Sequence, residues 1–159
     1  MKVRDAMVKT PVSCSLETNL GGAVELMSKR NCGIVPIVDA HRKVMGVITD
    51  RDIAIATGTQ NRLPAEIKVA EAATRKVHSC KPTDDVRWAL DIMGENKVRR
   101  LVVVNDQNQL EGVLSMDDVV LYAETNPTGR ADISADDVLR TLKALYSPQL
   151  SARAAGAER

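Results

Sequence analysis

The stretch GVITDRDI, residues 46–53, decides the fold of this chain because it recurs as GVLSMDDV at residues 112–119. At this offset of 66 residues, residues 3–53 superimpose without gaps on residues 69–119. A repeat of this kind indicates two copies of one structural unit. The identical pairs are Val3 with Val69, Ala6 with Ala72, Ser13 with Ser79, Cys14 with Cys80, Ala23 with Ala89, Met27 with Met93, Val38 with Val104, Gly46 with Gly112, Val47 with Val113 and Asp52 with Asp118.

Each copy predicts the same order of elements. An extended piece precedes a helix whose apolar residues recur at helical spacing, as Leu20, Ala23 and Met27 do. Two strands joined by a polar turn follow, and a second helix closes the unit. The fold class is therefore α+β, with the order β-α-β-β-α twice. The expected strands are 12–15, 34–38, 44–49, 77–80, 101–104 and 110–115, and the expected closing helices are 50–56 and 116–123.

Patterning along the chain also sets the expected boundaries. A final helix over 134–146 would place Val138, Leu142 and Leu145 on one face. A repeat of about 55 residues cannot bury both faces of its half-sheet alone. The two repeats are therefore expected to pack sheet to sheet about a pseudo-twofold axis. The segments are a first repeat at 1–57, a linker at 58–66, a second repeat at 67–125, a C-terminal loop and helix at 126–147 and a flexible tail at 148–159.

Composition favours a soluble cytoplasmic protein. The 159 residues carry a net charge of +1, so no overall field attracts nucleic acid or an anionic membrane. No apolar run approaches the roughly 18 residues of a membrane span, and the charged N-terminus does not have the pattern of a signal peptide. Three cysteines without CxxC spacing fit a reducing compartment.

The pair Thr49 and Asp52, with its counterpart Ser115 and Asp118, could serve two purposes. A Ser or Thr followed three residues later by an acid is typical of a capping box at a helix start. Residues 134–137 have the same pattern, so the pattern alone does not indicate a ligand site. Thr49 and Ser115 differ because each ends a strand that opens with Gly-Val. A hydroxyl and a carboxylate delivered to a helix start could bind phosphate and sugar hydroxyls, so capping alone and capping with ligand binding both stay open.

Residues 3–123 resemble a tandem pair of cystathionine β-synthase (CBS) domains, a Bateman module of the stand-alone bacterial type. The matching stretches are VPIVDAHRKVMGVITDRDI at 35–53 and VRRLVVVNDQNQLEGVLSMDDV at 98–119. In that family the Asp holds the ribose hydroxyls of an adenosine nucleotide, and the Thr or Ser lies near the phosphate, in a cleft between the repeats. The resemblance therefore implies two sites, one with Thr49 and Asp52 and one with Ser115 and Asp118. It also implies a homodimer.

Basic residues near the motifs are candidates for phosphate contacts, as in similar modules. They are Arg51, Lys76 and one of Arg99 and Arg100. Neighbouring strand residues face opposite sides of a sheet, so only one of the two adjacent arginines can face the site, and which one stays open. The first repeat has Gly33 and Ile34 at these positions, so the two sites are expected to differ in charge.

The base is expected beside the first extended piece of each repeat, where backbone groups can read the exocyclic amine of adenine. Pro36 fits the family pattern, whereas Val102 departs from it and leaves the shape of the second pocket open. Gly46 and Gly112 are assigned to close packing or a bulge and not to the ligand. The residues expected near the base are Thr10, Pro11 and Val12 in the first repeat, and Lys76, Val77 and His78 in the second.

No arrangement typical of catalysis is visible in the sequence. Cys14 and Cys80 are interpreted as small buried residues and not as a metal or disulfide pair. His41 lies in a polar turn, and His78 has no metal-binding partner at the usual spacing. A nucleophile elbow and a Gly-rich phosphate loop are both missing. An enzyme acting on nucleotides is therefore the weakest hypothesis, and no metal or required cofactor is predicted.

The predicted function is a regulatory module that binds AMP, ADP, ATP or an adenine dinucleotide such as NAD and changes the state of an unidentified partner protein. The alternative is a ligand-free scaffold for dimerisation. Nucleic acid and membranes are not expected partners.

Overall fold

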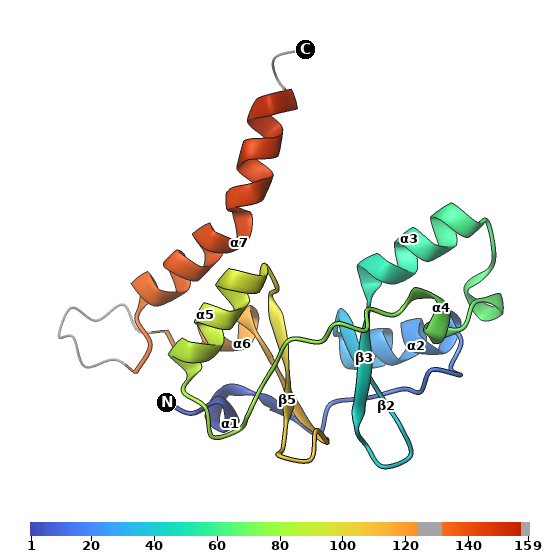
Figure 1. Ribbon diagram of the computed structural model, residues 1–159, viewed down its shortest axis with the longest axis horizontal. Helices are drawn as coiled ribbons and strands as arrows, with labels where there is room; N and C mark the ends of the chain where they lie inside the picture. Colours follow the sequence, from blue (N-terminus) through green and yellow to red (C-terminus); the bar gives the residue numbers. More distant parts are fainter. Residues whose placement is uncertain (124–131, 157–159) are drawn as a thin grey trace. The chain divides into compact units, whose positions relative to one another are not determined.

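The computed structural model describes residues 1–123 and 132–156 (Figure 1). It has the mixed α+β composition that the sequence predicts. The elements in chain order are α1 (Val3–Ala6), β1 (Val8–Lys9), α2 (Leu20–Arg30), β2 (Ile34–Val38), β3 (Val44–Thr49), α3 (Asp50–Gln60), the 3-10 helix η1 (Pro64–Glu66), α4 (Val69–Ala72), β4 (Ser79–Cys80), α5 (Val86–Asn96), β5 (Arg100–Val104), β6 (Leu110–Ser115), α6 (Met116–Val120) and α7 (Ala135–Gly156).

The chain folds into two compact units that do not coincide with the two sequence repeats. One unit combines residues 1–9 and 78–103 with the described residues from Gly112 to Gly156, and the other combines residues 10–77 with residues 104–111. The predicted boundaries treated each repeat as one unit. The start of each repeat instead folds with the later strands of the other repeat.

Strand pairing shows the same mixing of residues from the two repeats. The sheet of the first unit has the order β1-β6-β5-β4, with Val8 of β1 opposite Val113 of β6 and with β4 parallel to β5. In the other unit, β2 and β3 form the antiparallel pair, and Thr74 bridges Val47 of β3. Thr74 and Val47 lie 66 residues from Val8 and Val113, so the two units repeat one design.

The hairpin strands agree closely with the prediction, and the helix ends differ. The predicted strands 34–38, 44–49 and 110–115 are confirmed, and β5 begins one residue early. The predicted extended pieces 12–15 and 77–80 were too long, since only Ser79–Cys80 forms a strand and Cys14 makes an isolated bridge. α3 runs past residue 56 into the predicted linker because its left-handed cap comes only at Asn61. α6 ends at Val120, short of the predicted residue 123.

The C-terminal helix α7 is longer than predicted. It runs from Ala135 to Gly156, so the predicted C-terminal helix is present and continues into the segment from residue 148 that was predicted as a tail. The Ala-rich stretch after Pro148 has high helix propensity, which outweighs the hydrogen bond that the proline removes. Figure 1 shows α7 changing direction along its length, as a proline inside a helix produces. No helix in the described ranges has the length and apolarity to cross a membrane.

Both units have aliphatic cores. The core of the first unit joins α1, α5, the sheet and α7, and includes Val3, Leu101, Leu114 and Leu145. The core of the second joins α2, the β2–β3 pair and α4, and includes Leu20, Ile37, Ile48 and Val69. These cores fix the ends of β3 and β6, where the candidate site residues lie.

Candidate functional site

Thr49 ends β3 and caps α3. Its hydroxyl oxygen accepts from the Asp52 backbone N–H at 3.2 Å. In return, the Asp52 carboxylate oxygen Oδ2 accepts from the Thr49 backbone N–H at 2.9 Å and from the Thr49 hydroxyl at 2.7 Å. The predicted capping box is therefore present, and both side chains are half-buried.

Ser115 and Asp118 form the same arrangement where β6 meets α6. The Ser115 N–H and hydroxyl donate to Asp118 Oδ2 at 2.8 Å and 2.6 Å. Ser134 and Asp137 repeat it at the start of α7, with distances of 3.0 Å and 2.8 Å. Local geometry therefore does not separate the two candidate sites from an ordinary cap.

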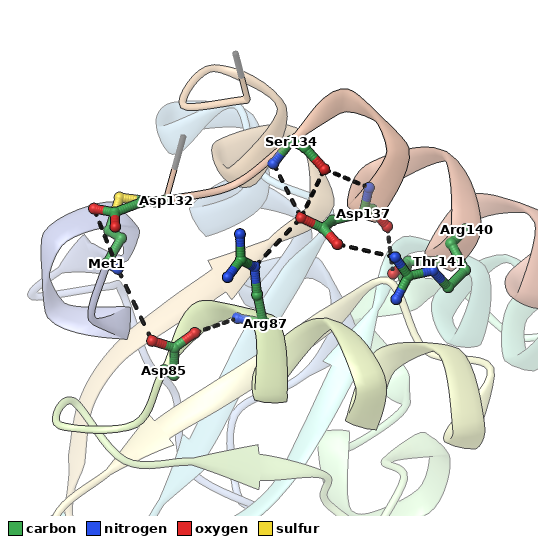
Figure 2. Close-up of polar contacts among 8 residues, drawn as sticks. All are labelled: Met1, Asp85, Arg87, Asp132, Ser134, Asp137, Arg140 and Thr141. Carbon is green, nitrogen blue, oxygen red and sulfur yellow. Dashed lines mark hydrogen bonds and ion pairs between the residues drawn. The ribbon is translucent and has the colours of Figure 1, made fainter. Parts of the chain in front are cut away.

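Charge neutralisation does separate them. Figure 2 shows that Asp137 lies between two arginines, with Arg87 Nε at 3.4 Å and Arg140 at 3.1 Å. Hydrogen bonds from the Ser134 backbone, followed by those from its side chain and by the charge of Arg87, lower the pKa of Asp137. Within residues 1–123 and 132–147, Asp52 and Asp118 form no ion pair, and their second oxygens, Oδ1, accept no hydrogen bond.

The glycines that open the two Gly-Val stretches allow close backbone approach, as predicted. A Cβ on Gly46 would lie 2.9 Å from the Thr74 carbonyl oxygen, and one on Gly112 would lie 2.9 Å from the Val8 carbonyl oxygen. Both contacts are tighter than Cβ atoms make. Because they lack a Cβ, these glycines let the segments around Thr74 and Val8 pair with β3 and β6, each segment coming from the start of the other repeat.

The basic candidates differ in their surroundings. Arg51 and Lys76 are exposed. The Arg99 guanidinium carbon lies 4.9 Å from the centre of the Tyr146 ring on α7, whereas Arg100 is half-buried in β5. Tyr146 had no predicted role, and its position near the helical face of Leu142 and Leu145 was the signal available in the sequence.

The extended pieces predicted to hold the base differ between the repeats. Thr10 is exposed and has a left-handed backbone with φ of 51°, which is strained for a β-branched residue. In the second repeat, the Val102 N–H donates to the His78 carbonyl oxygen at 3.2 Å. The equivalent residue in the first repeat is Pro36, which has no N–H. The Val12 carbonyl oxygen, the counterpart of that of His78, therefore lacks this ladder hydrogen bond.

Cys14 and Cys80 are buried thiols, and Cys32 is half-buried. Burial raises the pKa of Cys14 to about 11 and that of Cys80, to which the charge of Asp84 also contributes, to about 12. Both thiols are therefore protonated at neutral pH, which disfavours metal binding. The described residues contain no cluster of three His, Cys, Asp or Glu side chains placed to hold a metal ion.

A pocket of about 120 Å³ lies in the first unit, and none of the predicted site residues lines it. Its walls come from α5 and α7, next to the capped Asp137 of Figure 2. The lining residues are Arg87, Leu90, Asp91, Asp137, Arg140 and Thr141.

The chain belongs to the CBS domain family. The family model matches twice, at residues 3–57 and 69–125, and together these cover most of the sequence. Each match contains one of the hydroxyl–acid pairs described above.

Relatives of known sequence or structure are similar over the same region. The CBS domain-containing protein YhcV of Bacillus subtilis is 31% identical over 124 residues, which cover 78% of this chain and 86% of YhcV. An inosine-5'-monophosphate dehydrogenase of Methanocaldococcus jannaschii is 30% identical, but this chain spans 23% of that protein. The solved CBS domain pair of protein MJ0100, in complex with 5'-methylthioadenosine and S-adenosyl-L-methionine, is 26% identical with a TM-score of 0.69, covering 76% of this chain and 94% of that one.

Proposed function

We propose that this CBS domain pair is a non-catalytic regulatory module that binds adenosine-containing ligands, with AMP, ADP, ATP and adenine dinucleotides as the candidates. Asp52 and Asp118 would accept hydrogen bonds from the ribose hydroxyls. Thr49 and Ser115 would lie near the phosphate, together with the nearby basic residues. Binding would favour one conformation of the chain and so alter the state of a partner protein.

The observation that carries this proposal is the contrast between three otherwise identical capping boxes. Asp137 is neutralised by Arg87 and Arg140. Asp52 and Asp118 each keep a carboxylate oxygen without a hydrogen bond from the described residues. A carboxylate oxygen that no described residue engages is a strong acceptor for a vicinal diol, since hydrogen bonds to charged groups are the stronger class.

The MJ0100 pair supports the adenosine part of the proposal. Its two ligands, 5'-methylthioadenosine and S-adenosyl-L-methionine, share an adenine and a ribose diol and carry no phosphate. The ligand class proposed here is therefore defined by adenosine first, and phosphate is a separate question for the experiments.

Thermal melting tests the proposal directly. A ligand present at about 100 times its Kd stabilises the native state by about 2.7 kcal/mol, which corresponds to a rise in Tm of roughly 5–10 °C for a chain of this size. We expect such a rise with AMP and a smaller one with 2'-deoxy-AMP, which lacks one of the ribose hydroxyls. If AMP, ATP, NAD, 5'-methylthioadenosine and S-adenosyl-L-methionine all leave Tm unchanged, the chain is a ligand-free scaffold and the proposal is wrong.

A second prediction concerns base recognition in the two repeats. The Val12 carbonyl, which Pro36 leaves without a ladder hydrogen bond, can accept from the exocyclic amine of adenine, whereas that of His78 is already paired with Val102. Replacing Pro36 by valine supplies the missing N–H. In a chain carrying Asp118→Ala, we expect Pro36→Val to reduce the preference for AMP over IMP, which has no amine, by about 5- to 10-fold.

The reciprocal change is the control. In a chain carrying Asp52→Ala, Val102→Pro frees the His78 carbonyl and should increase the preference for AMP over IMP. Isothermal titration calorimetry measures both ratios. Unchanged ratios in both variants would show that these carbonyls do not read the base.

A further inference from the structure

Residues 144–147 of α7 contact the segment that leads into β5. The Arg99 guanidinium lies over the Tyr146 ring at 4.9 Å, within the range of a cation–π interaction. Lys97 Nζ donates to the Ala144 carbonyl oxygen and lies 3.5 Å from Ser147 Oγ. This turn of α7 therefore engages two neighbouring cations of the second repeat.

The first repeat lacks both cations. The residues equivalent to Lys97 and Arg99 are Asn31 and Gly33. Gly33 keeps the backbone role of Arg99, because its carbonyl accepts from the Asp50 N–H as the Arg99 carbonyl accepts from the Met116 N–H. The backbone pattern is thus common to the repeats, and the side-chain contact with α7 is specific to the second.

Arg99 connects α7 with the candidate site of the second repeat. Its carbonyl oxygen accepts from the N–H of Met116, the residue after Ser115, at 2.9 Å. Its side chain contacts the Tyr146 ring on α7. A guanidinium is an effective partner for phosphate because it presents a rigid fork of N–H donors. A phosphate beside Ser115 would therefore attract the Arg99 guanidinium, which already contacts Tyr146 on α7.

We propose that Tyr146 is a positioning residue that holds Arg99 on α7 and so limits its access to the phosphate of a nucleotide bound at Ser115 and Asp118. This inference rests on the function proposed above. Phosphate and the Tyr146 ring compete for one guanidinium. Nucleotide binding therefore loosens residues 144–147, the turn from which the last part of α7 continues. Because coupling between two sites is reciprocal, a partner that moves α7 also changes nucleotide affinity.

Comparison of AMP with adenosine tests this competition, because adenosine has no phosphate. All proteins carry Asp52→Ala, so that calorimetry reports on the second repeat. Tyr146→Leu keeps an apolar side chain but removes the ring, and we expect AMP to bind about two- to five-fold more tightly while adenosine affinity stays unchanged. Tyr146→Phe keeps the ring and should change neither affinity.

A double-mutant cycle isolates the pair. With Arg99→Met present, Tyr146→Leu should no longer alter AMP affinity. Equal changes for AMP and adenosine would show that Tyr146 only supports packing, and unchanged or weaker AMP binding by Tyr146→Leu would also overturn the inference. If the Asp52→Ala parent binds AMP and Tyr146→Leu in that parent binds it with the same affinity, this inference is wrong and the proposed function still stands. If neither the natural chain nor the parent binds AMP or adenosine, the proposed function falls as well.

Discussion

Replacing Asp52 by alanine is expected to weaken AMP binding to the first repeat by about 10- to 100-fold, and Asp118→Ala should do the same in the second. A hydrogen bond to a charged group contributes roughly 1.5–3 kcal/mol, and each 1.4 kcal/mol is tenfold in affinity. Each substitution removes the carboxylate that we propose accepts hydrogen bonds from the ribose diol. Calorimetry with AMP measures the loss, and the Asp52→Ala and Asp118→Ala double variant should show no binding.

Both substitutions also remove a helix cap, so the loss of affinity needs a control for stability. Asp137→Ala is that control, since Asp137 makes the same hydrogen bonds to Ser134 that Asp52 makes to Thr49. It should lower the free energy of unfolding by about 1 kcal/mol or more and leave AMP affinity unchanged. AMP affinity that survives in Asp52→Ala and Asp118→Ala would remove these carboxylates from the sites.

Replacing Gly46 by alanine is expected to destabilise the unit formed by residues 10–77 and 104–111 by about 1–3 kcal/mol. This is the usual cost of forcing an extra methyl group into a packed region. The new Cβ would lie 2.9 Å from the Thr74 carbonyl oxygen, a backbone atom that cannot move aside as a flexible side chain can. Gly112→Ala meets the Val8 carbonyl oxygen at the same distance and should behave similarly. Urea unfolding measures both changes.

Gly58 provides the matched control. It lies within α3, and a Cβ there would meet nothing within 4 Å. Gly58→Ala should therefore raise the free energy of unfolding by about 0.5–1 kcal/mol, as expected for a helix interior. If Gly46→Ala proves as stable as Gly58→Ala, the segment around Thr74 does not pack against β3 as described.

The hairpin strands could be predicted closely because their signals are local. Alternating apolar residues and the polar turns at 39–43 and 105–109 mark the ends of β2, β3 and β6 without reference to distant residues. Helix ends were predicted less well. The end of α3 depends on a left-handed cap at Asn61, and the length of α7 depends on the balance between Pro148 and the Ala-rich stretch that follows.

The sequence by itself determined the internal repeat, the α+β class, the CBS resemblance and the three capping boxes, because each is written in residue types at short or regular spacing. Only the tertiary structure decided which carboxylates are neutralised, which arginine lies on Tyr146, and that the start of each repeat packs with the strands of the other. The contacts behind these features reach from 27 positions, between Val47 and Thr74, to 105 positions, between Val8 and Val113. Long-range pairing of this kind depends on which apolar faces bury one another and on which strand edges need a hydrogen-bonding partner. No local sequence pattern encodes it.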